Sequence, residues 1–95
     1  MISNVTKLKF IALAAKYGVQ VEHFVPGEVV ISIATWRRHK TNFFQLMDDL
    51  RNDPNIYSIT FDETTGFVYI SYDHSSLNNK ATINNWLHIF KRYSF

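Results

Sequence analysis

Apolar residues recur at intervals of three and four along the first part of the chain, which is the spacing of one face of an α-helix. Gly18 follows the last periodic position, where a glycine commonly ends a helix. The pattern predicts a helix over about residues 4–17 with one buried face. That face would consist of Val5, Leu8, Ile11, Ala12 and Ala15.

Apolar and polar residues then alternate on both sides of Pro26–Gly27, which predicts two antiparallel strands at about 19–25 and 28–35. The register depends on the loop length, because a slip of one residue moves every side chain to the other face. An odd-numbered loop would bury Val25, whereas an even-numbered loop would bury Phe24. The odd-numbered loop buries more apolar side chains and is the prediction.

A second helix is expected over about residues 42–52. Asn42 and Gln45 have the spacing of a capping box, and Pro54 disfavours helix in the residue before it. The predicted buried stripe consists of Phe43, Leu46, Met47 and Leu50.

Two further alternating segments, 56–61 and 67–72, flank a turn that contains Gly66, and this arrangement predicts a β-hairpin. Tyr57 and the alternate residues after it should face the helices, so that Phe67 and Tyr69 face away from them. A last amphipathic helix should begin near Asn79. Its apolar positions are Ile83, Trp86, Leu87, Phe90 and Tyr93.

The predicted order is helix, strand, strand, helix, strand, strand, helix. From the second strand onward this is the ferredoxin-like split unit without its last strand, and the first strand would supply the missing edge. The expected fold class is therefore α+β: a ferredoxin-like two-layer sandwich with a four-stranded antiparallel sheet in permuted order. Helices would cover one face, with the N-terminal helix as an addition, in a single domain over residues 1–95.

The composition excludes several kinds of functional site. The absence of Cys excludes disulfides, thiolate metal sites and a thiol nucleophile, and a net charge of +2 carries little information about partners. The apolar run FIALAA is too short for the core of a signal peptide, and no run approaches the ~18 residues of a membrane helix. We therefore expect a cytoplasmic chain with no membrane insertion.

The run VPGEVVISI, then LMDDLRNDPNIYSITFDETTGFVYISYD, then a closing amphipathic helix, is similar to heavy-metal-associated domains and their degenerate relatives over about residues 19–93. That family binds metal through two cysteines, separated by two residues, between its first strand and first helix. Here the corresponding place, 35–41, holds no Cys and the fixed charges Arg37, Arg38 and Lys40, which would repel a cation. The resemblance implies an interaction or regulatory module, linked to metal transport or homeostasis, without metal or cofactor.

The basic residues Arg37, Arg38 and Lys40 allow two interpretations. At the N-terminal end of a helix they could bind a phosphate or another anion, since helix dipoles and Arg side chains both favour one there. Alternatively, they form an exposed loop that is partly paired with Asp62 and Glu63 at the same end of the sheet.

The segment from Gly66 to Tyr72 resembles the third-strand motif of RNA-recognition modules, in which two alternate aromatic residues stack on bases. Phe67 and Tyr69 would then bind nucleic acid together with the basic loop. The alternative is that Phe67, Tyr69 and Val30 form an apolar patch covered by a second copy or another protein. We favour self-association or a protein partner, with nucleic acid or another polyanion as the second hypothesis.

Few residues of the sequence have the spacing that a catalytic or metal site requires. Asp48 and Asp49 are adjacent on a helix, so their carboxylates diverge, and the segment 73–75 (Asp-His-Ser) is typical of a helix cap. The four histidines have no paired spacing for a metal: they are His23, His39, His74 and His88. The sequence predicts neither a catalytic nor a metal site.

Overall fold

The computed structural model describes residues 3–95, and its elements follow the predicted order. They are α1 (Asn4–Lys16), β1 (Gln20–Val25), β2 (Glu28–Ser32), α2 (Lys40–Arg51), β3 (Ile56–Asp62), β4 (Phe67–Tyr72) and α3 (Lys80–Tyr93). Two short 3-10 helices, η1 (Trp36–Arg38) and η2 (His74–Asn78), precede α2 and α3. Each predicted helix and strand is thus present, with small shifts at its ends.

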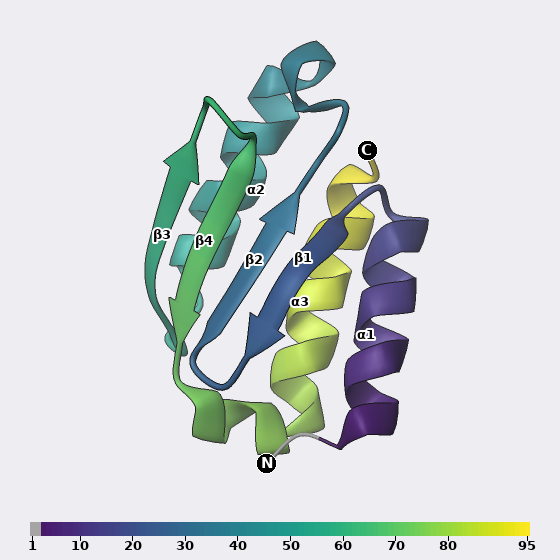
Figure 1. Ribbon diagram of the computed structural model, residues 1–95, viewed down its shortest axis with the longest axis vertical. Helices are drawn as coiled ribbons and strands as arrows, with labels where there is room; N and C mark the ends of the chain where they lie inside the picture. Colours follow the sequence, from purple (N-terminus) through teal and green to yellow (C-terminus); the bar gives the residue numbers. More distant parts are fainter. Residues whose placement is uncertain (1–2) are drawn as a thin grey trace.

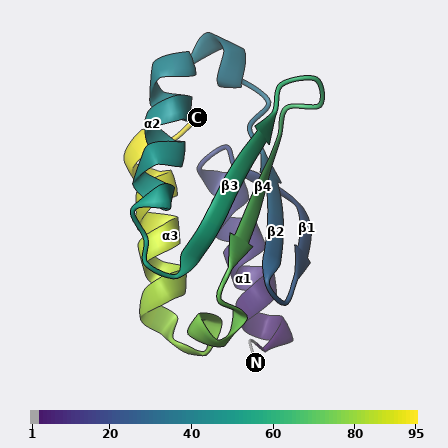
Figure 2. The same ribbon diagram turned by 90° about the vertical axis from the view of Figure 1, so that its left-hand side faces the viewer.

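The four strands form one antiparallel sheet in the order β1-β2-β4-β3. Figure 1 shows α2 and α3 behind this sheet and α1 beside β1. Viewed from the β3 edge, the helices lie on one side, and the described residues leave the opposite face of the sheet open (Figure 2). The predicted α+β class with a four-stranded antiparallel sheet is therefore confirmed.

Helix α1 packs through a different face from the predicted one. Its buried residues are Phe10 and Ala14, and the Phe10 ring lies 5.5 Å from the ring of Phe24. The predicted stripe is wrong: Val5, Leu8, Ala12 and Ala15 are exposed, and Ile11 is half-buried. Periodicity alone did not separate two apolar faces of one helix, and the face with the large aromatic ring is the one that packs.

Strand β1 contains one extra residue, Glu22, between its pairs with β2. The turn after it consists only of Pro26–Gly27, because Val25 pairs directly with the first residue of β2. Phe24 is consequently buried and Val25 turns outward, so the prediction of an odd-numbered loop is wrong. The bulge offsets the even-numbered turn and keeps Val21 on the buried side as well.

Strand β3 carries a second bulge. Tyr57 lies between the pairs that Ile56 and Ser58 make with β4. Tyr57 is 69% exposed and Ile56 only 8%, so the prediction that Tyr57 faces the helices is wrong. Ile59 and Phe61, beyond the bulge, pack against the core as expected.

Helix α2 begins at Lys40 rather than at Asn42, because the residues just before it already have the helical conformation of η1. Asn42 therefore lies inside the first turn, and Gln45 donates a hydrogen bond to Asp49 instead of reaching back. The predicted capping box is wrong. Helix α3 begins after Asn79, whose side chain accepts a backbone hydrogen bond of the first turn.

The carboxylate of Asp49 joins α2 to α3. It accepts hydrogen bonds from the Tyr93 hydroxyl and, at 2.9 Å, from the Arg92 guanidinium. The Tyr93 hydroxyl, with the smaller help of Gln45 and Arg92, holds the pKa of Asp49 below its usual 3.8. The negative form is thus the one that the fold stabilises.

Replacing Asp49 by asparagine is expected to lower the free energy of unfolding by about 1–2 kcal/mol at neutral pH. Because the folded pKa is lowered, this contribution is present above pH 3.8 and is lost as the pH falls through the folded pKa. Urea denaturation across pH 2–7 measures it. The control is Asp48→Asn, an exposed carboxylate; a difference between Asp49→Asn and wild type that persisted at the lowest pH would contradict the prediction.

Candidate interaction surfaces

The basic loop is built around a buried tryptophan. Trp36 is 6% exposed, and its ring lies 4.9 Å from Phe61 and 5.3 Å from Phe43. The guanidinium of Arg37 lies over the outer face of the Trp36 ring, at 4.9 Å from its centroid. The segment between β2 and α2 is thus anchored by an aromatic cluster.

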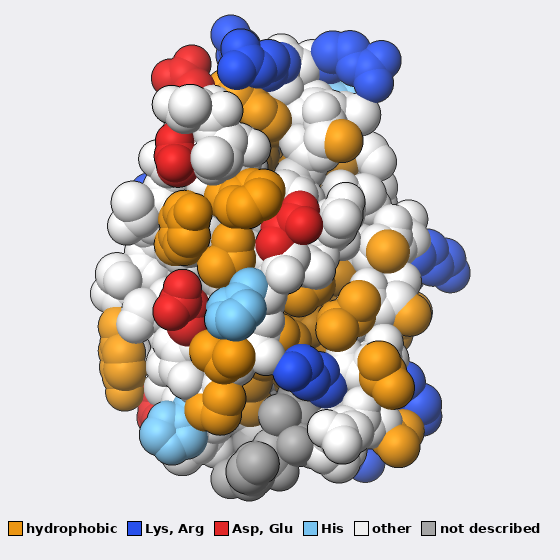
Figure 3. All heavy atoms as spheres, viewed as in Figure 1, with side chains coloured by type: hydrophobic (Ala, Val, Ile, Leu, Met, Phe, Trp, Pro, Cys, Tyr) orange, Lys and Arg blue, Asp and Glu red, His pale blue; other side chains and the backbone are white. Residues whose placement is uncertain are grey.

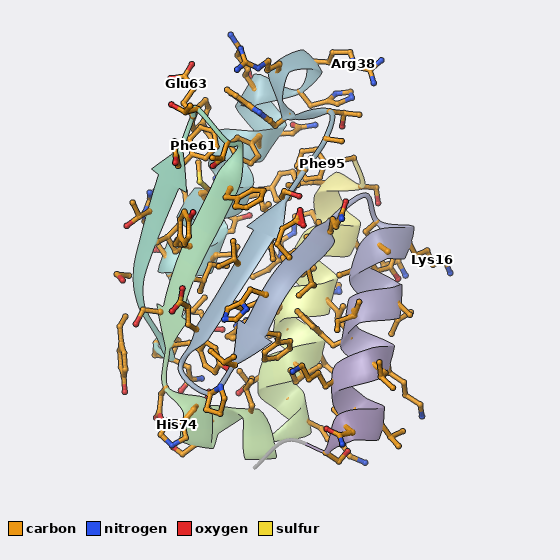
Figure 4. All side chains as sticks on the ribbon, in the orientation of Figure 1. Lys16, Arg38, Phe61, Glu63, His74 and Phe95 are labelled. Carbon is orange, nitrogen blue, oxygen red and sulfur yellow. The ribbon has the colours of Figure 1, made fainter. Side chains whose placement is uncertain are left out.

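Arg38 and Lys40 are exposed beyond this cluster. Figure 4 shows Arg38 and Glu63 at the same end of the sheet. Over residues 3–95, however, the ion pairs are Arg51–Asp48 and Arg92–Asp49, so the expected pairing of the loop with the β3–β4 turn does not form. Anion binding by the loop stays a prediction.

The histidines lie far apart in the fold. His23 is in β1, His39 precedes α2, His74 is in η2 and His88 is in α3. Within the described part of the chain, no three His, Cys, Asp or Glu side chains lie close enough to hold a metal ion.

The acidic residues considered for catalysis have other contacts. Asp48 pairs with Arg51 on the surface of α2, and Asp49 joins α2 to α3. Asp73 accepts hydrogen bonds from the backbone N–H and the hydroxyl of Ser75. The expected capping role is thus confirmed, and the helix that Asp73 caps is η2, which the sequence did not predict. Each of these carboxylates therefore has a structural role in the fold.

The register of the sheet arranges its open face in three rows. Each row crosses β1, β2, β4 and β3 in that order, because paired residues point to the same side. The rows are Gln20–Ser32–Phe67–Asp62, then His23–Val30–Tyr69–Thr60, then Val25–Glu28–Ser71–Ser58. Two aromatic residues and one buried valine thus lie side by side near the centre of the face.

This apolar patch consists of Val30, Phe67 and Tyr69. Val30 is only 4% exposed although none of the described helices covers its side of the sheet, which means that its neighbours on the open face already enclose it. Tyr69 is paired with Val30 and is 37% exposed, and its ring lies 6.4 Å from that of Phe67. The sequence placed these three residues together, and the pairing of the strands brings them into contact range.

The charged residues of the four strands are all acidic. The four strands contain Glu22, Glu28 and Asp62 but no Lys or Arg. In Figure 3, orange, red and pale blue side chains occupy the middle of this face, whereas blue side chains lie at its upper end, along the α1 side and beside the lower part of β1. The ammonium of Lys7 in α1 donates a hydrogen bond to the Phe24 carbonyl of β1. A nucleic-acid strand stacked on Phe67 and Tyr69 would therefore find carboxylates where its phosphates need cations.

A shallow hollow of about 130 Å³ lies beside the patch. Its lining residues are Gly27, Glu28, Ser58, Thr60, Tyr69, Ile70 and Ser71. Small-molecule sites usually measure roughly 300–1,000 Å³. The open face is therefore better suited to a protein surface than to a small ligand.

Comparison with family models, with curated proteins and with solved structures finds no significant match to this chain. Over residues 3–95, no helix has the length and apolar content needed to cross a bilayer.

Proposed function

We propose that this chain is a non-catalytic interaction module that self-associates through the open face of its sheet. The observation that carries the proposal is the apolar patch of Val30, Phe67 and Tyr69 on a face that no helix within residues 3–95 covers. Large apolar side chains near the centre of a mostly polar face are typical of interaction sites. The absence of Lys and Arg from the four strands favours a protein occupant over nucleic acid.

We further propose that the module has the ferredoxin-like arrangement of the heavy-metal-associated type and serves a metal-transport or regulatory system. The strand order β1-β2-β4-β3 supports the first part, since it is the order that the permuted split unit requires. The second part rests on the resemblance alone, because fold does not determine function. In this proposal Trp36 and its aromatic neighbours replace the metal loop, so the module binds its partner without metal.

Replacing Tyr69 by lysine is expected to release single chains from the oligomer. An ammonium group in the centre of the apolar contact would have to lose its hydration and would replace the aromatic ring that packs there, which weakens association by about 100-fold or more. Light scattering over a concentration series measures the mass of both proteins.

The matched control is Tyr57→Lys, which makes the same substitution at a residue that is 69% exposed and lies outside the apolar patch. This variant should keep the wild-type mass. A wild-type protein that is a single chain at all concentrations, or a Tyr69→Lys variant that keeps the oligomeric mass, would refute the proposed function.

A further inference from the structure

Helix α1 presents an exposed apolar stripe that the core does not use. Val5 and Leu8 are 63% and 66% exposed, and Ala12 and Ala15 continue the same line along the helix. The opposite side of α1 packs on the domain through Phe10. This helix therefore has two apolar faces, one of which has no partner within residues 3–95.

The surroundings of this stripe are basic. Lys9 and Lys16 are exposed and lie along one side of the stripe, as their spacing of seven residues requires. Neither takes part in an ion pair over the described residues, and the segment 3–18 contains no acidic residue. The apolar stripe with Lys9 and Lys16 is called the α1 stripe below.

The α1 stripe and the open sheet face have opposite charge. The sheet face contains an apolar patch among Glu22, Glu28 and Asp62, whereas the α1 stripe contains apolar residues beside lysines. Their lengths also match: the 13 residues of α1 span about 20 Å, and a six-residue strand spans roughly the same. Apolar contact at the centre and opposite charges at the rim are the features of a complementary pair of surfaces.

Other modes of self-association are less favourable. Two open faces packed on each other would bring Glu22, Glu28 and Asp62 toward the same carboxylates of the second copy, which is a like-charge contact. Pairing through a sheet edge is disfavoured because β1 and β3, the two edge strands, each carry a bulge.

We infer that the α1 stripe of one copy docks on the open sheet face of the next. This inference rests on the proposed function and specifies how the open face is covered. Such a contact joins two different surfaces, so each copy still offers one free surface after the first contact. The assembly therefore grows until it closes into a ring or continues as a filament.

Two variants test the inference by complementation. Leu8→Glu damages the α1 stripe and keeps the sheet face, whereas Tyr69→Lys damages the sheet face and keeps the α1 stripe. Each variant alone should be a single chain, and mixing them should restore an assembly that contains both in equal amounts by native mass spectrometry. Val5→Glu repeats the first variant at a second exposed position, and Phe44→Glu, at an exposed residue of α2, is the matched control that should assemble normally.

The outcomes separate this inference from the proposed function. If Tyr69→Lys dissociates but Leu8→Glu keeps the wild-type mass, the open face does associate but another surface covers it, and the inference is overturned. If Tyr69→Lys also keeps the wild-type mass, the proposed function fails as well. Circular dichroism of each variant confirms that a loss of assembly does not come from unfolding.

Salt and lipid supply two independent readouts. Association between oppositely charged surfaces should weaken at least several-fold when NaCl is raised from about 0.05 to 1 M, whereas a like-charged contact between two sheet faces should strengthen. If the chain stays single in solution, and vesicles of phosphatidylserine and phosphatidylcholine bind wild type but not Leu8→Glu, the α1 stripe serves a membrane and the inference is wrong.

Discussion

Replacing Asp53 by alanine is expected to lower the free energy of unfolding by about 3 kcal/mol, a large share of the roughly 5–15 kcal/mol of a small domain. Asp53 is 6% exposed in the turn between α2 and β3. It accepts hydrogen bonds from the indole N–H of Trp86 at 2.8 Å, from the side-chain amide of Asn85 at 3.1 Å and from the backbone N–H of Asn55 at 2.8 Å. Removing the carboxylate leaves these donors without an acceptor.

Asp53→Asn should lower the free energy of unfolding by less than Asp53→Ala, because asparagine keeps one acceptor oxygen. Asn52→Ala, at the exposed neighbouring position, is the control and should change stability by less than about 0.5 kcal/mol. Urea denaturation followed by tryptophan fluorescence gives the three values. Equal midpoints for Asp53→Ala and Asn52→Ala would mean that the hydrogen bond to Trp86 does not hold the turn against α3.

The role of Asp53 illustrates what the sequence did not reveal. Beside Pro54, it appears as one of several polar residues that end a helix. Its main partner, Trp86, lies 33 residues further along the chain, and no local pattern announces such a contact. The order of elements was predictable because it depends on spacing within each segment, whereas buried polar contacts depend on how distant segments meet.

The strand registers show the same limit. Alternation gave the correct faces for β4, where Val68 and Ile70 are buried and Tyr69 is exposed. It failed at Val25 and Tyr57, because each of the two edge strands contains one extra residue that reverses the alternation. A bulge is defined by the pairing of two strands, so one strand read alone does not reveal it.

The candidate site was predictable in part for similar reasons. Phe67 and Tyr69 follow the correct alternation of β4, and the strand order then brings Val30 beside them. The burial of Val30 depends on side chains from neighbouring strands, and no pattern within β2 indicates it. What covers the patch remains a proposal that the variants above test.

The second large loss of stability is expected in helix α1. Phe10→Ala is expected to cost about 3–5 kcal/mol, because the ring is 1% exposed and its removal leaves a cavity. The surrounding aromatic residues are held by this ring: Phe24, Trp86 and Phe90 lie 5.5, 6.3 and 6.0 Å from it between ring centroids. Leu8→Ala, two residues earlier, should change stability by less than about 0.5 kcal/mol because Leu8 is 66% exposed.

The same pair of variants decides which face of α1 belongs to the core. The periodicity of the sequence predicts a large cost at Leu8 and a small one at Phe10, and the packing of α1 predicts the reverse. Urea denaturation must be measured at concentrations where the protein is a single chain, since association would add its own free energy to the Leu8 value. A larger loss of stability for Leu8→Ala than for Phe10→Ala under those conditions would mean that α1 packs on the core through the face that contains Leu8. The α1 stripe would then be buried, and the contact inferred between copies would lose its surface.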